Sequence, residues 1–393
     1  MLLGLDFRTL RQRSFWYWAW AFLAIIAGML LSQHLDEKHS WIEMRYQAYR
    51  GLGWVTPHHP EAKNVVLVMI GDNEFWIGPL ARRTPLHRDY LARVIKALDG
   101  CNPAVIALDI DLESPTPDGT LRDNTEYTAE TQALVTTVLE VSRNRPIILA
   151  ASIEFKSPRE PFFLESSVYG ELPFSTGKLQ RGYINLPFDV RKIPTPQPVH
   201  KGGMLDSFAL AIVRAQRGES VPDDMKGGDI LPFGTFIEKG FPTLSTSDVL
   251  AGHCGRIASK IAIIGSRWHK LSFNEGAVTD IHITPVGPMS GAALHANYAE
   301  AVLDSRTYRP LPKGLERGIE FSISALFAIL LAVKTHRTYQ KLAVVLVCSA
   351  ALIFLSYIAW QNCGYYFDFF FPVAFLLAHA FGHYFVELWL GAH

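Results

Sequence analysis

The chain has 393 residues, with 37 basic and 37 acidic side chains and a formal net charge of zero. It is too long for one small domain, and its balanced charge excludes a bulk electrostatic attraction to nucleic acid. Its 4 cysteines show neither CxxC nor Cys/His spacing, so a zinc site and a dense disulfide framework are not expected.

The first apolar run is an expected membrane helix. Arg8, Arg11 and Arg13 precede residues 15–31 (FWYWAWAFLAIIAGMLL), which carry no charge. A membrane helix needs about 17–25 residues, and the basic residues place its start in the cytoplasm. A cleaved signal peptide is the alternative. The following segment, LLSQHLDEKH, has no small-x-small cleavage site, so we expect the helix to remain.

The middle of the chain alternates strand-like and helix-like segments. Strands are expected at residues 64–71, 104–108 and 147–151, with helices at 86–98 and 126–142 between them. The strands are continuous apolar runs, which are typical of strands buried on both faces of a parallel sheet. This order predicts an α/β fold with a mainly parallel sheet covered by helices.

The next region is less regular and leads into the most distinctive segment of the chain. A strand and turn are expected at residues 182–194, a helix at 204–216 and strand-like structure at 233–252. Residues 259–297 then read as a strand, a polar loop rich in Gly and Pro, and the start of a helix. In α/β folds this arrangement places polar groups at the carboxyl end of the sheet.

Three further apolar runs follow, at residues 319–333, 342–360 and 367–388. The loop after the first run is basic and the loop after the second is not, which places the first loop in the cytoplasm. The expected segments are cytoplasmic ends at 1–14 and 390–393, membrane helices at 15–32, 317–333, 342–360 and 367–389, a cytoplasmic loop at 334–341, an extracytoplasmic loop at 361–366 and an exported domain at 33–316.

Acidic and histidine side chains follow three of the predicted strands. Asp72, Asp109 and Asp111 follow the first two, and Asp280 and His282 lie in the loop after the third. If these strands are parallel neighbours, their carboxyl ends converge where α/β sheets bind ligands. Such groups can hold a divalent cation or form an acid/base pair, but no spacing here is metal-specific, and no metal is expected.

A structural interpretation of these residues stays open beside the functional one. They can cap helices, bond loop backbones and pair with nearby arginines. His295 lies in an apolar-faced helix and is expected to be a satisfied structural histidine, while Thr284, Pro285 and Pro288 are expected to set a rigid turn. The ligand-binding candidates are Asp72, Arg83, Asp109, Asp111, Asp280, His282, Thr284 and His295.

Two other sets of residues are candidates for specific contacts. Cys101 and Cys254 both precede strands of the exported domain, where an oxidising compartment permits a disulfide, although sequence does not show that they are close. In the last apolar run, His379, His383 and Glu387 recur every four residues and share one helix face. That face is expected to contact a partner helix, and a proton relay is the weaker alternative.

Six segments of the chain together resemble one known family. In chain order they are VVLVMIGDNE, RRTPLHRDYLARVI, AVIALDIDL, GYINLPFDVRKIP, KIAIIGS and DIHITPVGPMSGAALHAN. Together with one helix before them and three after, they resemble the type-2 CHASE domain, an extracytoplasmic sensory module of bacterial membrane receptors. The resemblance covers residues 39–311 and implies a multipass protein of the bacterial inner membrane that forms a dimer. Members usually continue into a cytoplasmic kinase or cyclase, whereas this sequence ends at His393, so a separate output partner is expected.

No enzyme motif stands out, since the chain has no GxxxxGK[ST] loop, no GxSxG elbow and no HExxH helix. We therefore expect no catalytic activity and no cofactor. The first hypothesis is a receptor subunit that binds an unknown extracytoplasmic ligand or protein and signals through a separate partner. The alternatives are a structural or scaffolding subunit of a membrane complex and, more weakly, an extracytoplasmic hydrolase that uses the Asp/His cluster.

Overall fold

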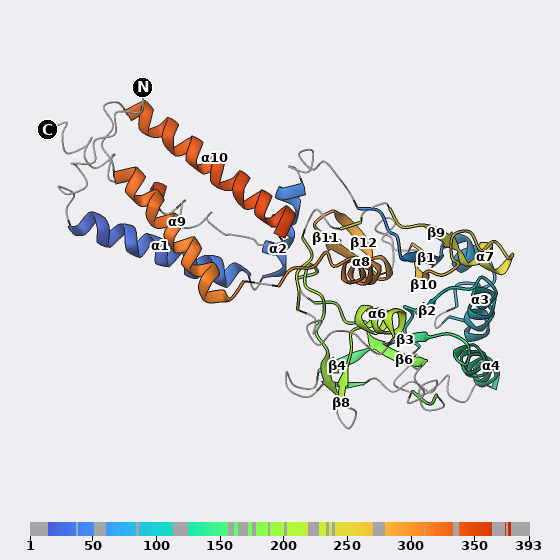
Figure 1. Ribbon diagram of the computed structural model, residues 1–393. Helices are drawn as coiled ribbons and strands as arrows, with labels where there is room; N and C mark the ends of the chain where they lie inside the picture. Colours follow the sequence, from blue (N-terminus) through green and yellow to red (C-terminus); the bar gives the residue numbers. More distant parts are fainter. Residues whose placement is uncertain are drawn as a thin grey trace. The chain divides into compact units, whose positions relative to one another are not determined.

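Figure 1 shows a computed structural model of the chain, which divides into two compact units, residues 1–51 with 309–393 and residues 52–308. The residues that it describes are 15–36, 38–50, 60–83, 86–112, 125–155, 161–163, 172–174, 178–187, 189–199, 203–218, 228–232, 236–237, 240–269, 280–309, 311–332, 338–363, 374 and 376–378.

The larger unit is built on a six-stranded sheet in which every neighbouring pair of strands is parallel. Its order is β6-β3-β2-β10-β1-β9. The strands are β1 (Val65–Ile70), β2 (Val105–Leu108), β3 (Ile147–Ala151), β6 (Leu179–Tyr183), β9 (Thr243–Ser245) and β10 (Ile261–Ser266). All residues of β1, β2 and β3 are buried, which explains why their sequences are apolar throughout. The predicted α/β fold with a mainly parallel sheet is confirmed.

Helices cover both faces of this sheet (Figure 1). One layer contains α3 (Arg88–Gly100), α4 (Thr125–Ser142) and the short α7 (Thr246–Leu250), and α3 packs against both of the others. The opposite layer contains α6 (Phe208–Arg217) and α8 (Gly291–Leu303). Helix α8 lies so close to β10 that a Cβ atom at Gly265 would be 2.4 Å from the Cβ of Ala292. This close approach fixes the start of α8 beside the end of β10.

Among the described residues, three small antiparallel pairs of strands lie outside the sheet: β4 (Ile153–Phe155) with β5 (Pro161–Phe163), β7 (Gln197–Val199) with β8 (Gly203–Leu205), and β11 (Ile281–Thr284) with β12 (Gly287–Ser290).

The structure differs from the sequence predictions at two places. The expected polar loop before α8 contains the β11–β12 hairpin, whose turn is the predicted rigid one: Thr284 pairs with Gly287, and its Oγ1 donates to the Gly287 carbonyl oxygen at 2.6 Å. The helix expected at 204–216 begins only at Phe208, because Ser207 caps it.

The smaller unit contains α1 (Phe15–Asp36), α2 (His39–Arg50), α9 (Lys313–Ala332) and α10 (Thr338–Cys363). Within the described residues, two stretches are long and apolar enough to cross a membrane, Trp18–Leu35 and Leu346–Cys363. Helix α9 starts earlier than its predicted apolar run, so it also carries Lys313, Glu316 and Arg317 before that run. Most of the fourth predicted membrane helix lies outside the described residues, including His379, His383 and Glu387.

Packing inside the smaller unit joins its helices through apolar and aromatic contacts. Phe22 of α1 and Phe321 of α9 meet edge to face with ring centroids 6.0 Å apart. Tyr46 of α2 stacks on Trp360 of α10, also at 6.0 Å. Large apolar side chains of α1 and α10 stay exposed, among them Trp20, Leu23, Leu346 and Leu355.

Candidate functional site

The order of the central strands brings several polar residues to the carboxyl edge of the sheet. Strands β2 and β1 flank β10, so the segments that follow all three leave the sheet at the same end. Asp109 follows β2 directly, and its backbone N–H donates to the Ile264 carbonyl oxygen of β10 at 2.8 Å. The first residues of α8 lie against β10 at this edge, as the close contact of Gly265 with Ala292 shows.

Asp280 is held at the start of α8 by hydrogen bonds to the helix. The backbone N–H of Gly291 donates to the Asp280 main-chain carbonyl at 3.0 Å and to its Oδ2 at 3.1 Å. The other carboxylate oxygen, Oδ1, lies 2.8 Å from Nε2 of His282. A Cβ atom at position 291 would be 2.1 Å from Asp280 Oδ2, so this contact requires glycine.

His295 lies one turn further into α8 and is almost completely buried, with 1% of its surface exposed. Its ring meets Phe208 and Tyr298 edge to face, and it hydrogen-bonds the backbone at Ile184. Within the described part of the chain, its Nδ1 has no hydrogen-bond partner. Burial lowers the pKa of His295 to about 4, so the imidazole is neutral at physiological pH and presents an unused nitrogen.

Asp109 completes the group, and its pKa is shifted upward, whereas that of His295 is shifted downward. Burial of its carboxyl, assisted by the negative charge of Asp280, raises the pKa of Asp109 to about 8. At neutral pH Asp109 is therefore largely protonated and can donate a hydrogen bond. The site thus combines a neutral carboxylic acid, the Asp280–His282 pair and the neutral imidazole of His295, which together suit hydrogen bonding to a small polar molecule.

Asp72 is not part of this group, although it also follows a central strand. Its Oδ1 accepts from the His269 backbone N–H at 2.8 Å, and its Oδ2 lies 2.7 Å from His269 Nδ1. The backbone hydrogen bond from His269 is the main cause that lowers the pKa of Asp72. Next to this pair, Phe75 stacks on Trp268 with ring centroids 4.3 Å apart. Asp72 therefore joins the segment after β1 to the segment after β10 and has a structural role.

The remaining candidates have local partners. Asp111 accepts a hydrogen bond from Ser152 Oγ at 3.0 Å, and the Thr284 hydroxyl is used inside its hairpin turn. Arg83 contacts Glu130 on α4, a residue that the sequence analysis did not identify. Glu130 gave no sequence signal, because its partners Arg83, His87 and Arg88 lie 42 or more positions away. Of the eight ligand-binding candidates, the structure gathers Asp109, Asp280, His282 and His295.

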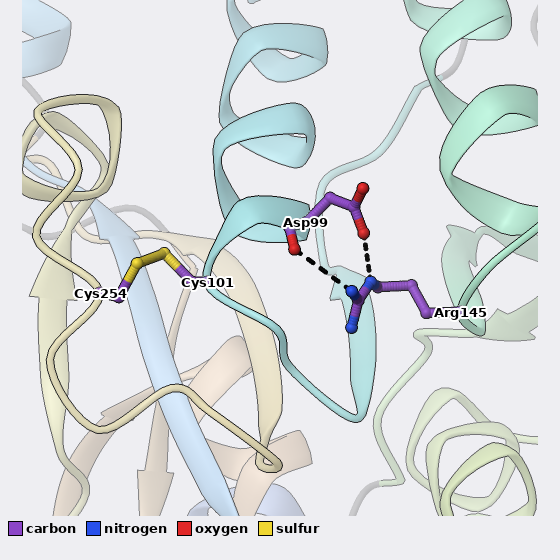
Figure 2. Close-up of a disulfide and its surroundings, with 4 residues drawn as sticks. All are labelled: Asp99, Cys101, Arg145 and Cys254. Atoms are coloured by element: carbon purple, nitrogen blue, oxygen red, sulfur yellow. Dashed lines mark hydrogen bonds and ion pairs between the residues drawn. A yellow bond between two sulfur atoms is a disulfide. The ribbon is translucent and has the colours of Figure 1, made fainter.

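Cys101 and Cys254 form a disulfide, with their Cα atoms 5.2 Å apart (Figure 2). On the other side of the end of α3, the Arg145 guanidinium pairs with the Asp99 carboxylate and also donates to the Asp99 main-chain carbonyl at 3.2 Å. The two interactions hold the turn from α3 into β2. Cys348 and Cys363 are free.

The chain was compared with known protein families, curated proteins and solved structures. A family model described as the CHASE2 domain matches residues 18–333. This match includes the whole six-stranded sheet, most of α1 before it and all of α9 after it. No curated protein and no solved structure matches the chain.

Proposed function

The chain belongs to the CHASE2 domain family of extracytoplasmic sensory domains, and from that premise we propose that it is the receptor subunit of a membrane sensor. In this proposal the α/β unit binds a small polar ligand outside the cytoplasm, and a separate signalling partner receives the change. The contact face of His379, His383 and Glu387 for such a partner stays a prediction, as does dimer formation.

The proposed topology has four membrane helices with both chain ends in the cytoplasm. Two observations support it. Helices α1 and α10 contain apolar stretches of membrane-spanning length. Basic residues precede α1 and also occur in the loop at 334–341, which contains Lys334, Arg337 and Lys341. The disulfide between Cys101 and Cys254 fits an oxidising compartment for the α/β unit. The fourth helix, at residues 367–389, rests on its sequence alone.

The observation that carries the ligand site is the unpartnered Nδ1 of the buried His295. A buried polar atom without a partner costs about 1–3 kcal/mol, so natural proteins keep few of them outside functional sites. A ligand that donates a hydrogen bond to this nitrogen satisfies it. Asp109 and the Asp280–His282 pair supply a donor and acceptors for the rest of a polar ligand.

Helix α8 offers a direct connection from this site to the membrane helices. His295 belongs to the first turns of α8, and Asp280 accepts a hydrogen bond from Gly291, the first residue of this helix. After the end of α8 at Leu303 the chain enters α9 at Lys313. A ligand that changes the position of α8 therefore acts on the element that leads into α9. This is a hinge or shear type of transition, in which packed helices slide by small amounts.

Topology is tested by labelling introduced cysteines with a membrane-impermeant maleimide in right-side-out membrane vesicles. In a Cys348→Ala/Cys363→Ala background, Ala258→Cys on the exposed surface of the α/β unit should be labelled. The matched variant Lys341→Cys, in the predicted cytoplasmic loop, should be labelled only after the vesicles are opened. The reverse pattern would exclude an extracytoplasmic sensor.

Function is tested by purifying the full chain from native membranes after mild crosslinking and identifying its partners by mass spectrometry. A kinase, cyclase or similar enzyme in fixed ratio supports the receptor. An envelope or secretion assembly instead supports a structural subunit. The hydrolase alternative requires Asp109 and His282 to lie within direct or water-bridged reach of one another, and it stays a prediction.

A further inference from the structure

A second polar cluster lies between α3 and α4, in a pocket of about 460 Å³. His87, Asp89, Arg93 and Glu130 are among its lining residues. His87 and Asp89 come from the start of α3, whereas Glu130 comes from α4. The cluster has no residue in common with the ligand site proposed above.

The geometry of three of these residues suits a transition-metal ion. One ligand atom from each of His87, Asp89 and Glu130 lies within 4.8 Å of the others. His87 Nδ1 is 3.1 Å from Glu130 Oε1 and 3.9 Å from Asp89 Oδ1. In a tetrahedral zinc site with bonds of about 2.0–2.2 Å, donor atoms are roughly 3.3–3.6 Å apart. Small side-chain movements would therefore bring all three donors to bonding distance.

Glu130 is held in place before any ion binds. Its side chain is 8% exposed, and its Oε2 accepts from the backbone N–H of Arg88 at 3.1 Å. Arg88, also buried, donates to Thr131 Oγ1 and to the Leu112 carbonyl oxygen, each at 2.6 Å. These contacts fix α3 against α4 and leave Glu130 Oε1 facing His87. Such outer contacts orient the ligands of metal sites.

The guanidinium of Arg83 lies between Glu130 and His87, where a metal ion bound by these residues would lie. Its Nη1 contacts Glu130 Oε1 and lies 2.6 Å from His87 Nδ1. A guanidinium only donates hydrogen bonds, and the two atoms that it contacts here, His87 Nδ1 and Glu130 Oε1, are the atoms that would bind the ion. Arg83 and a metal ion would therefore use the same two atoms, and only one of them can bind at a time.

The segment that carries Arg83 has an unusual backbone. Ala81 and Arg82, just before it, both have positive φ, at 46° and 63°. Neither residue is glycine, and this conformation costs about 1–2 kcal/mol per residue. The contacts of Arg83 help to hold this turn, so release of Arg83 would allow the segment between β1 and α3 to relax.

We propose that His87, Asp89 and Glu130 form a binding site for a divalent transition-metal ion of the zinc class, which binds in exchange for Arg83. The imidazole ligand favours zinc-like ions over Mg²⁺ or Ca²⁺, which prefer oxygen ligands alone. Three protein ligands leave the fourth position open to water from the pocket. The inference goes beyond the proposed receptor function and does not depend on it.

The first test titrates Zn²⁺ into the detergent-solubilised full chain, stripped of metal by chelation, with calorimetry as the readout. His87→Ala should weaken the tightest site by at least about tenfold, since even the loss of an outer contact costs about 10- to 100-fold. The control is His253→Ala, which removes an exposed histidine that is 4.0 Å from Asp248. Equal titration curves for His87→Ala and the wild type would overturn the proposal.

The second test distinguishes metal exchange from a purely structural ion pair. Arg83→Met removes the competing cation, so it should bind Zn²⁺ more tightly than the wild type. Zn²⁺ should also restore the thermal stability that this variant loses, whereas Mg²⁺ should not. Absence of rescue by Zn²⁺, or equal affinity in Arg83→Met and the wild type, would overturn the exchange.

Discussion

Cys101 and Cys254 are 153 positions apart in the sequence, and the disulfide between them ties the end of α3 to the loop after α7. The loop that it closes contains β2, β3, β6 and β9, so it spans most of the sheet. Because closure of a long loop removes much entropy from the unfolded chain, this disulfide is expected to stabilise the α/β unit strongly.

Loss of this disulfide should therefore lower the free energy of unfolding of the α/β unit by about 2–4 kcal/mol. The measurement compares thermal unfolding of the wild type and of Cys101→Ala/Cys254→Ala, each with and without reductant. Reductant should destabilise the wild type and have no effect on the variant. The control, Cys348→Ala/Cys363→Ala, should keep the full sensitivity to reductant. A wild type that is insensitive to reductant would contradict the prediction.

Glu300 should stabilise the folded α/β unit by holding the residues that lead into β1. This fully buried carboxylate of α8 accepts from the backbone N–H groups of Lys63 and Asn64, the two residues before β1. Glu300→Ala removes the acceptor of both part-buried hydrogen bonds and should cost about 1–3 kcal/mol in total. Glu300→Gln keeps one oxygen acceptor and should cost less. Denaturant unfolding of the full chain measures the difference, and equal losses would show that the two hydrogen bonds do not matter.

Gly291 should be required for the position of Asp280. Gly291→Ala places a methyl group 2.1 Å from Asp280 Oδ2, so Asp280 must leave the start of α8. We expect a loss of stability of about 0.5–1.5 kcal/mol, because the half-exposed Asp280 side chain can turn away and lose its hydrogen bond to Gly291. The matched control is Gly100→Ala, because a Cβ atom at Gly100 meets nothing within 4 Å. If both variants unfold at the same temperature, the contact between Asp280 and Gly291 is not structurally important.

The fold was largely predictable because its main strands are buried on both faces. β1, β2 and β3 consist almost entirely of apolar residues, which mark them in any reading of the sequence. The β11–β12 hairpin was missed for the opposite reason. Its residues Ile281 and Ile283 stay partly exposed, and its Gly and Pro residues are typical of loops. Strand order depends on packing between distant segments and has no local signal.

The candidate site was only partly predictable. The convergence of Asp109 and Asp280 follows from the rule that parallel strands end at one edge, so sequence reasoning reached it. The same rule placed Asp72 among the candidates, but it does not show that the backbone of His269 binds this carboxylate. The unpartnered Nδ1 of His295 was also unpredictable, since it depends on burial among side chains from α6 and α8.

Asp109 should make the stability of the α/β unit depend on pH. Its pKa is about 8 when folded, against an ordinary value of 3.8, so between these values the folded state holds a proton that the unfolded state has released. The free energy of unfolding should therefore fall as pH rises through this window, by at most about 1.4 kcal/mol per pH unit. Asp109→Asn mimics the protonated acid and should remove this fall.

The comparison is best made above about pH 6.5, because His295 acts in the opposite direction below it. Its pKa is about 4 when folded against an ordinary 6.5, so it costs stability only as pH falls through that range. Thermal unfolding from about pH 6.5 to pH 8 should show a declining midpoint for the wild type and a flatter profile for Asp109→Asn. The control is Asp111→Asn, an exposed carboxylate two residues away, which should decline like the wild type. Parallel profiles for all three proteins would mean that Asp109 is ionised in the folded unit and cannot donate a hydrogen bond to a ligand.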